Sequence, residues 1–305
     1  MDNKSHFFED GIVDLGAVLQ EEDCANLLKQ FYKLKPFDNK FFKEQVFLKE
    51  GEHDPTKSQV GSGPKPGRNL TEKVDLDFVE KNPEIKKALS EILGEDYRIM
   101  QKIFVMGVPE DMMPEWYQKI RKNGYGPLTP FINSKFYDMT YFSGIDYHQD
   151  MIDFKNRKGD FVTLYVYLDE VTPDMSPLHI VPKSHEFGAK DLTTISEDIT
   201  ITNDNKITYS NHEGKSKKFD YKMLTGKPGS VYFWSAYTLH GTMPTPSTHK
   251  ARISLRYLIE RGDSTKELPI DEFLKKINGP LILTKSNKDI PEFATASATG
   301  SGILR

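Results

Sequence analysis

The chain has 305 residues, 37% hydrophobic and 28% charged, with 19 phenylalanines and 14 tyrosines, a composition that excludes a disordered chain and predicts an aromatic-rich core. The net charge of -4 and the lack of a signal peptide or long apolar run argue against nucleic-acid or membrane partners, so we expect a cytoplasmic protein. Its single cysteine, Cys24, excludes an intrachain disulfide and a cysteine-rich zinc site, so a metal would need histidine and carboxylate ligands.

The N-terminal third predicts one strand and two helices. Phe8–Val18 alternates like a strand, and Glu21–Tyr32 has apolar residues at helical spacing. A second helix is marked by Asn82 as its N-cap, Pro83 in its first turn and a glycine at its end. The polar segment Glu50–Arg68 between the helices is rich in glycine and proline, which indicates a loop.

Beyond residue 97 the pattern is typical of strands. We predict strands at Tyr97–Met106, Ser134–Phe142, Phe161–Asp169, Leu178–Val181, Ile199–Tyr209, Gly229–Trp234 and Ala251–Ile259. In the third of these, aliphatic residues alternate with Thr163, Tyr165 and Tyr167, so both faces of the strand should be covered. The core is therefore expected to be mainly β, in a single domain over residues 1–290 with insertions near 50–70 and 111–130. Residues 291–305 are expected to form a flexible tail.

Three residues form a candidate metal site. His148 and Asp150 lie at the end of a strand pattern, and residues two apart on a strand point to the same side. His240 follows the apolar strand 229–234 and can supply a third ligand. Two imidazoles and one carboxylate on one face of an octahedron leave positions open for a bidentate oxoacid and dioxygen at Fe(II). A His-x-Asp pair alone is weak support, because such pairs occur by chance in a chain of this length.

Five ordered motifs resemble the phytanoyl-CoA dioxygenase family of Fe(II)/2-oxoglutarate oxygenases. They are Phe8–Val13, Ser134–Phe136 leading to Tyr147–Asp150, Leu178–His185, Lys227–Phe233 before His240-Gly241, and Arg252–Tyr257. The resemblance implies a double-stranded β-helix, a cupin-like jelly roll with flanking α-helices, and Fe(II) held by His148, Asp150 and His240. It also implies 2-oxoglutarate and dioxygen as cosubstrates. Related halogenases have a small residue where Asp150 stands, so halogenation is disfavoured.

The sequence departs from the family pattern at two turns. Lys183 replaces a usual glycine, from which we infer that this turn needs no positive φ angle. Ser230 replaces a usual aspartate, and we expect that missing carboxylate to have had a structural role.

The C-terminal strand carries two candidate anion-binding arginines. Arg252, twelve residues after His240, resembles the family arginine that binds the far carboxylate of 2-oxoglutarate, and Ser254 shares its face. Arg256 also lies on that face and resembles the second arginine of taurine dioxygenase, which binds the substrate's acid group. Two interpretations of Arg256 stay open: it binds a substrate anion, or it forms an ion pair within the fold.

The resemblance gives two weaker cosubstrate candidates, Gln101 and Lys135, on strands that line the pocket in the family. The expected reaction is oxidation of a small, anionic metabolite or natural-product intermediate by hydroxylation, desaturation or ring closure. A lipid acyl thioester is the alternative substrate that the family name suggests. Alternative functions are a non-catalytic jelly-roll module that binds an acidic small molecule, and a hydrolytic zinc site, for which Arg252 would have no need.

Overall fold

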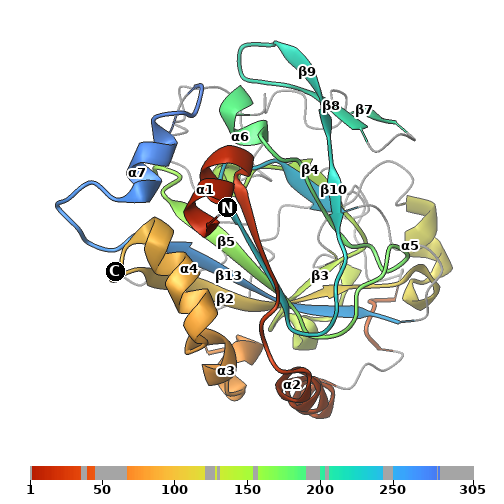
Figure 1. Ribbon diagram of the computed structural model, residues 1–305. Helices are drawn as coiled ribbons and strands as arrows, with labels where there is room; N and C mark the ends of the chain where they lie inside the picture. The colour runs from red at the N-terminus through yellow and green to blue at the C-terminus, as the bar shows by residue number, and fades with distance from the viewer. Residues whose placement is uncertain are drawn as a thin grey trace.

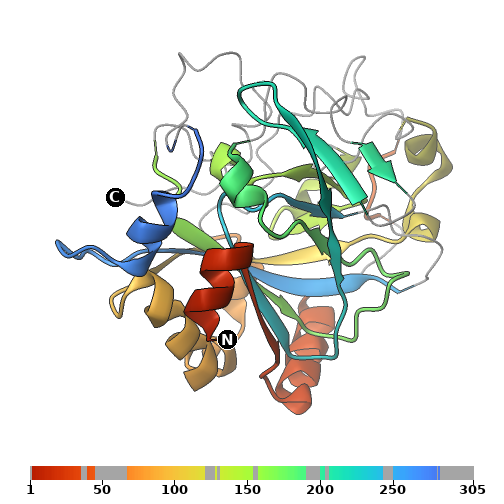
Figure 2. The ribbon, with the colours of Figure 1, turned by 45° about the horizontal axis from the view of Figure 1, so that its top comes forward.

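The fold consists of two facing β-sheets with helices packed on the outside of the larger one (Figures 1 and 2). The computed structural model describes residues 2–35, 40–44, 67–120, 128, 131–153, 157–189, 200–202, 206–242, 250–279 and 281. Most of the expected loop 50–68 and the whole of the expected tail 291–305 lie outside these residues, as does part of the expected insertion 111–130. Among the described residues, no helix has the length and apolar character needed to span a membrane.

The larger sheet carries the candidate residues Gln101, Arg252, Ser254 and Arg256. Its strand order is β1 (Ile12–Ala17), β11 (Ser230–Ser235), β5 (Phe161–Tyr167), β13 (Arg252–Glu260), β2 (Arg98–Gly107) and β3 (Thr140–Phe142). The smaller sheet has the order β10 (Lys222–Leu224), β6 (Leu178–Ile180), β12 (His240–Thr242) and β4 (Ile145–His148). A third sheet, β7 (Thr200–Thr202), β8 (Lys206–Ser210) and β9 (Ser216–Asp220), lies beyond the smaller one. Two facing, almost wholly antiparallel sheets form the jelly roll that the resemblance implied.

Helices cover the outer face of the six-stranded sheet (Figure 1). They are α1 (Asn3–Asp10), α2 (Glu21–Leu34), α3 (Asp77–Glu80), α4 (Pro83–Leu93) and α7 (Pro269–Leu274), while α5 (Glu115–Ile120) and α6 (Ser184–Phe187) lie elsewhere. The side chain of Asn82 accepts hydrogen bonds from the backbone N–H groups of Glu84 and Ile85, so its predicted role as the α4 N-cap is confirmed. Cys24 is buried on α2.

The alternation along β5 divides the core as predicted. Val162, Leu164 and Val166 pack against the helices, whereas Tyr165 and Tyr167 face the space between the sheets. Every residue of β5 is buried, because the strand lies inside the sheet with both faces covered. The interior face of β5 therefore presents aromatic side chains to the candidate site.

Two predictions from the sequence need correction, and a third is confirmed. Phe8–Asp10 is helical, not extended, because α1 runs to Asp10 and the strand begins only after Gly11, which adopts a left-handed conformation. The segment 134–142 is a strand only at Thr140–Phe142, since Ser134–Phe136 forms a 3-10 turn, η7. The expected hairpin at 199–209 is confirmed in outline, with β7 pairing to β8.

The inference that the turn at Lys183 needs no positive φ is wrong. Lys183 has a φ of 64° and is one of two non-glycine residues in the described segments with positive φ. Its backbone N–H donates to the Asp10 carbonyl at 3.0 Å, and its ammonium group contacts Glu9. The left-handed conformation costs an L-residue about 1–2 kcal/mol. We infer that these contacts with the end of α1 hold the turn in place despite that cost.

Candidate metal centre

The strand pairing of the smaller sheet brings the two candidate histidine ligands together. His148 is the last residue of β4, and His240 is the first of β12, directly opposite His148 in the antiparallel register. The ring centroids of the two histidines lie 4.4 Å apart. Residues that face each other across a ladder have neighbouring side chains, so this register places both imidazoles on the interior side.

Asp150 completes the group from a turn. The prediction that His148 and Asp150 lie close together is correct, but they do not share one face of a strand. Strand β4 ends at His148, and Asp150 begins a 3-10 turn, η8 (Asp150–Asp153). The Asp150 carboxylate lies 3.7 Å from Nε2 of His148 and 3.6 Å from Nε2 of His240. One ligand atom from each of the three residues lies within 4.8 Å of the others, and in the described part of the chain this is the one such cluster of histidine, cysteine and acidic residues. The residue between the ligands, Gln149, is buried and donates to the carbonyls of Gly188 and Tyr237.

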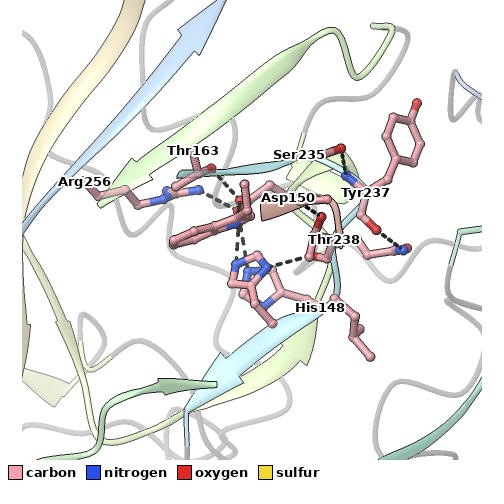
Figure 3. A network of polar contacts seen from close by, with 12 residues as sticks. His148, Asp150, Thr163, Ser235, Tyr237, Thr238 and Arg256 are labelled. Carbon is pink, nitrogen blue, oxygen red and sulfur yellow. Dashed lines mark hydrogen bonds and ion pairs between the residues drawn. The ribbon is translucent and has the colours of Figure 1, made fainter. Parts of the chain in front are cut away.

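The Asp150 carboxylate accepts three hydrogen bonds (Figure 3). Thr163 Oγ1 and Trp234 Nε1 donate to its Oδ2 atom at 2.5 and 3.1 Å, and Arg256 Nη2 donates to Oδ1 at 2.7 Å. Burial opposes ionisation of Asp150, but it is outweighed by His240, which is protonated in the acid range where Asp150 titrates, and by the positive charge of Arg256, so the pKa of Asp150 lies well below the ordinary value. Asp150 is therefore an anion near neutral pH, as a metal ligand must be.

The state of His240 also suits metal binding. Burial lowers the pKa of His240 to about 4, so its imidazole is neutral near pH 7, and Arg256 is then the cationic partner of Asp150. The Nδ1 atom of His240 lies 2.9 Å from the Thr238 carbonyl, to which it can donate its hydrogen. That tautomer leaves the Nε2 lone pair facing Asp150 and available to a metal.

Arg252 lies beside aromatic residues of β5 between the sheets. The residue is 2% exposed, and its Nε and Nη1 atoms have no hydrogen-bond partner among the described residues. Its guanidinium carbon lies 5.9 Å from the ring centroids of Tyr165 and Tyr167. The hydroxyls of Tyr165 and Ser254 also lack partners within the described segments, whereas the Tyr167 hydroxyl bonds to Leu178 and Leu224. A buried cation with unused donors and two free hydroxyls fits an anionic ligand.

The remaining candidates lie elsewhere on the fold. Gln101 lies half-buried on β2 opposite Leu258. The placement of Lys135 on a strand is wrong: it lies in η7, is exposed, and its ammonium group lies 4.8 Å from the ring centroid of Phe136. Tyr141 packs with Phe41 in the cluster on the helix side. Thr163 was not identified as a site residue from the sequence, although the alternation of β5 placed it on the interior face.

Comparison with known proteins gives a family and a fold. The family model described as phytanoyl-CoA dioxygenase (PhyH) matches residues 7–253. A protein of Stutzerimonas stutzeri named as a probable alpha-ketoglutarate-dependent hypophosphite dioxygenase is 29% identical over 111 residues, which span 36% of this chain and 38% of that protein.

Two solved structures share the fold. EvdO2 from Micromonospora carbonacea var. aurantiaca, also solved with 2-oxoglutarate, is 15% identical with a TM-score of 0.53 over 88% of this chain and 94% of its own. The non-heme alpha-ketoglutarate-dependent epimerase SnoN from nogalamycin biosynthesis is 14% identical with a TM-score of 0.50 over 85% and 80%. At these identities the likeness establishes the architecture alone.

Proposed function

The chain belongs to the phytanoyl-CoA dioxygenase family of Fe(II)/2-oxoglutarate-dependent oxygenases, and we propose that it oxidises a small carboxylate-bearing metabolite or natural-product intermediate. One observation carries this proposal: a His-Asp-His cluster, in which Asp150 and His240 are buried, and a buried arginine with unused donors both lie between the two sheets. A hydrolytic metal site would have no use for Arg252.

Each residue has a definite task in this proposal. His148, Asp150 and His240 would hold Fe(II), which supplies the oxidising chemistry once 2-oxoglutarate and dioxygen are present. Arg252 would bind the far carboxylate of 2-oxoglutarate, and the free hydroxyls of Ser254 and Tyr165 can donate to the same group. The buried aromatic residues of the interior would limit the access of water to the bound groups.

The charges in the site support an anionic substrate. In the described part of the chain, Asp150 is the one carboxylate that contacts Arg256. With Fe(II), 2-oxoglutarate, Asp150 and both arginines in place, the site keeps one positive charge in excess, which a substrate anion would balance. The hypophosphite in the name of the Stutzerimonas stutzeri relative is itself a small oxyanion. The ion pair with Asp150 agrees equally with a structural Arg256, so substrate binding by Arg256 stays a prediction.

Anaerobic titration tests the metal and the cosubstrate together. Fe(II) followed by 2-oxoglutarate should give the weak visible charge-transfer band of the chelate in the wild-type protein and no band in His148→Ala. A folded wild-type protein that binds neither Fe(II) nor 2-oxoglutarate would contradict the proposal. That result would favour a non-catalytic jelly-roll module.

A paired screen tests the anionic substrate. Candidate carboxylates and their amides would be compared by the succinate that each releases in excess of the substrate-free reaction. We expect carboxylates to stimulate release and amides to fail, and Arg256→Met to raise the substrate KM by about 100-fold, the equivalent of one strong charge-assisted contact. Equal stimulation by carboxylates and amides would contradict an anionic substrate.

A further inference from the structure

The two donors on Oδ2 of Asp150 come from one rigid part of the fold. Thr163 on β5 and Trp234 on β11 are direct partners in the antiparallel register of the larger sheet. Both side chains are buried, Thr163 at 0% and Trp234 at 1% exposure. The Trp234 ring is also packed, with its centroid 5.9 Å from that of Tyr165 and 4.9 Å from that of His240. Neither donor can turn away from Asp150 without disturbing the core.

Counting lone pairs shows how many acceptor directions of the Asp150 carboxylate remain free. Each carboxylate oxygen offers about two lone-pair directions. Thr163 and Trp234 take both directions on Oδ2, while Arg256 takes one on Oδ1. In the described residues, the one acceptor direction that these three donors leave is on Oδ1, which lies 3.7 Å from Nε2 of His148. Oδ2 lies 3.6 Å from Nε2 of His240, but both of its directions are occupied.

We propose that Thr163 and Trp234 are positioning residues that make Asp150 bind the metal through Oδ1 alone. The proposal rests on the metal site proposed above. A carboxylate that chelated the metal through both oxygens would take a fourth coordination position. Only two positions would then remain, too few for a bidentate oxoacid and a third small ligand. By occupying Oδ2, the two donors keep that position open.

The proposal can be tested with Co(II) chloride as a spectroscopic substitute for Fe(II). Thr163→Val removes the hydroxyl and keeps the shape, Thr163→Ser keeps the hydroxyl, and Trp234→Phe removes the indole N–H and keeps a ring. Loss of a group that orients a metal ligand typically weakens metal binding by about 10- to 100-fold. We expect that loss in Thr163→Val and Trp234→Phe, with a changed visible d–d spectrum as Oδ2 joins the metal. Thr163→Ser should keep the wild-type affinity and spectrum.

A matched control separates positioning from general destabilisation. Tyr209→Phe removes another buried hydroxyl, which donates to the Ser184 carbonyl at 2.8 Å in a separate cluster. It should lower the melting temperature without changing the Co(II) affinity or spectrum. If Thr163→Val does not fold, Trp234→Phe alone decides the question.

The two proposals fail in different ways. A folded wild-type protein that binds no Co(II) or Fe(II) would remove the metal site itself, and the positioning role with it. Wild-type protein that binds the metal, together with folded variants of unchanged affinity and spectrum, would overturn the positioning role and leave the proposed function standing.

Discussion

Replacing Arg252 by methionine should weaken 2-oxoglutarate binding strongly while leaving the fold intact. Arg252 is 2% exposed, and its Nε and Nη1 atoms have no partner among the described residues. A buried cation without an anion destabilises a protein, whereas an apolar side chain of similar length in its place is neutral or stabilising. The wild-type arginine is therefore expected to gain its partner only when a ligand binds.

The size of the effect follows from the lost ion pair. A bidentate, charge-assisted contact contributes about 3 kcal/mol, so the dissociation constant of 2-oxoglutarate should rise by roughly 150-fold. At a concentration of 100 times the wild-type dissociation constant, 2-oxoglutarate stabilises the wild-type protein by about 2.7 kcal/mol. The same concentration should stabilise Arg252→Met by only about 0.3 kcal/mol.

Thermal unfolding with Fe(II), in the absence of dioxygen, measures both quantities. At about 2 °C per kcal/mol, 2-oxoglutarate should raise the melting temperature of the wild type by about 5 °C and that of Arg252→Met by less than 1 °C. Arg252→Lys keeps the charge but loses the planar fork, so it should lie between them. An equal shift in wild type and Arg252→Met would refute the assignment. A large loss of stability in ligand-free Arg252→Met would show that Arg252 already has a stabilising partner in the absence of ligand.

Three further predictions concern stability. Lys183→Gly should raise the free energy of unfolding by about 1 kcal/mol, because glycine adopts the observed φ of 64° without strain; an unchanged or lower value in urea denaturation would contradict this. Tyr167→Phe should lower the free energy of unfolding by about 1–2 kcal/mol, because the Tyr167 hydroxyl makes two buried hydrogen bonds. Tyr165→Phe should lower it by almost nothing, because the Tyr165 hydroxyl has no partner among the described residues. Equal losses of stability in thermal unfolding would show that this assignment of free and bonded hydroxyls is wrong. Burial lowers the pKa of His185 from 6.5 to about 4, so the unfolded chain binds more protons than the folded chain between these values. The free energy of unfolding should therefore fall as pH drops from about 6.5 to 4, by roughly 3 kcal/mol at pH 4. His185→Phe should reduce this pH dependence in urea denaturation, and an unchanged pH dependence would contradict the prediction.

Local patterns in the sequence were enough to predict much of the fold. The Asn82 cap, the apolar spacing of α2 and α4, and the alternation of β5 each depend on residues close together in the chain. The phytanoyl-CoA dioxygenase resemblance predicted the jelly roll and the family, because its motifs occur in the expected order. Helix α1 and the 3-10 turn at Ser134–Phe136 were missed, since short helical segments carry little periodic signal.

The sequence by itself determined which residue types were available for a metal and an anion: His148, Asp150, His240 and two arginines on one strand face. Tertiary structure alone decided their partners. The register of β4 against β12 places the histidines opposite each other, and the pairing of β5 with β11 aims Thr163 and Trp234 at a carboxylate from a distant turn. The hydrogen bond from Trp234 to Asp150, for example, joins residues 84 positions apart. Their geometry depends on how the two sheets pack, and no local periodicity encodes that packing.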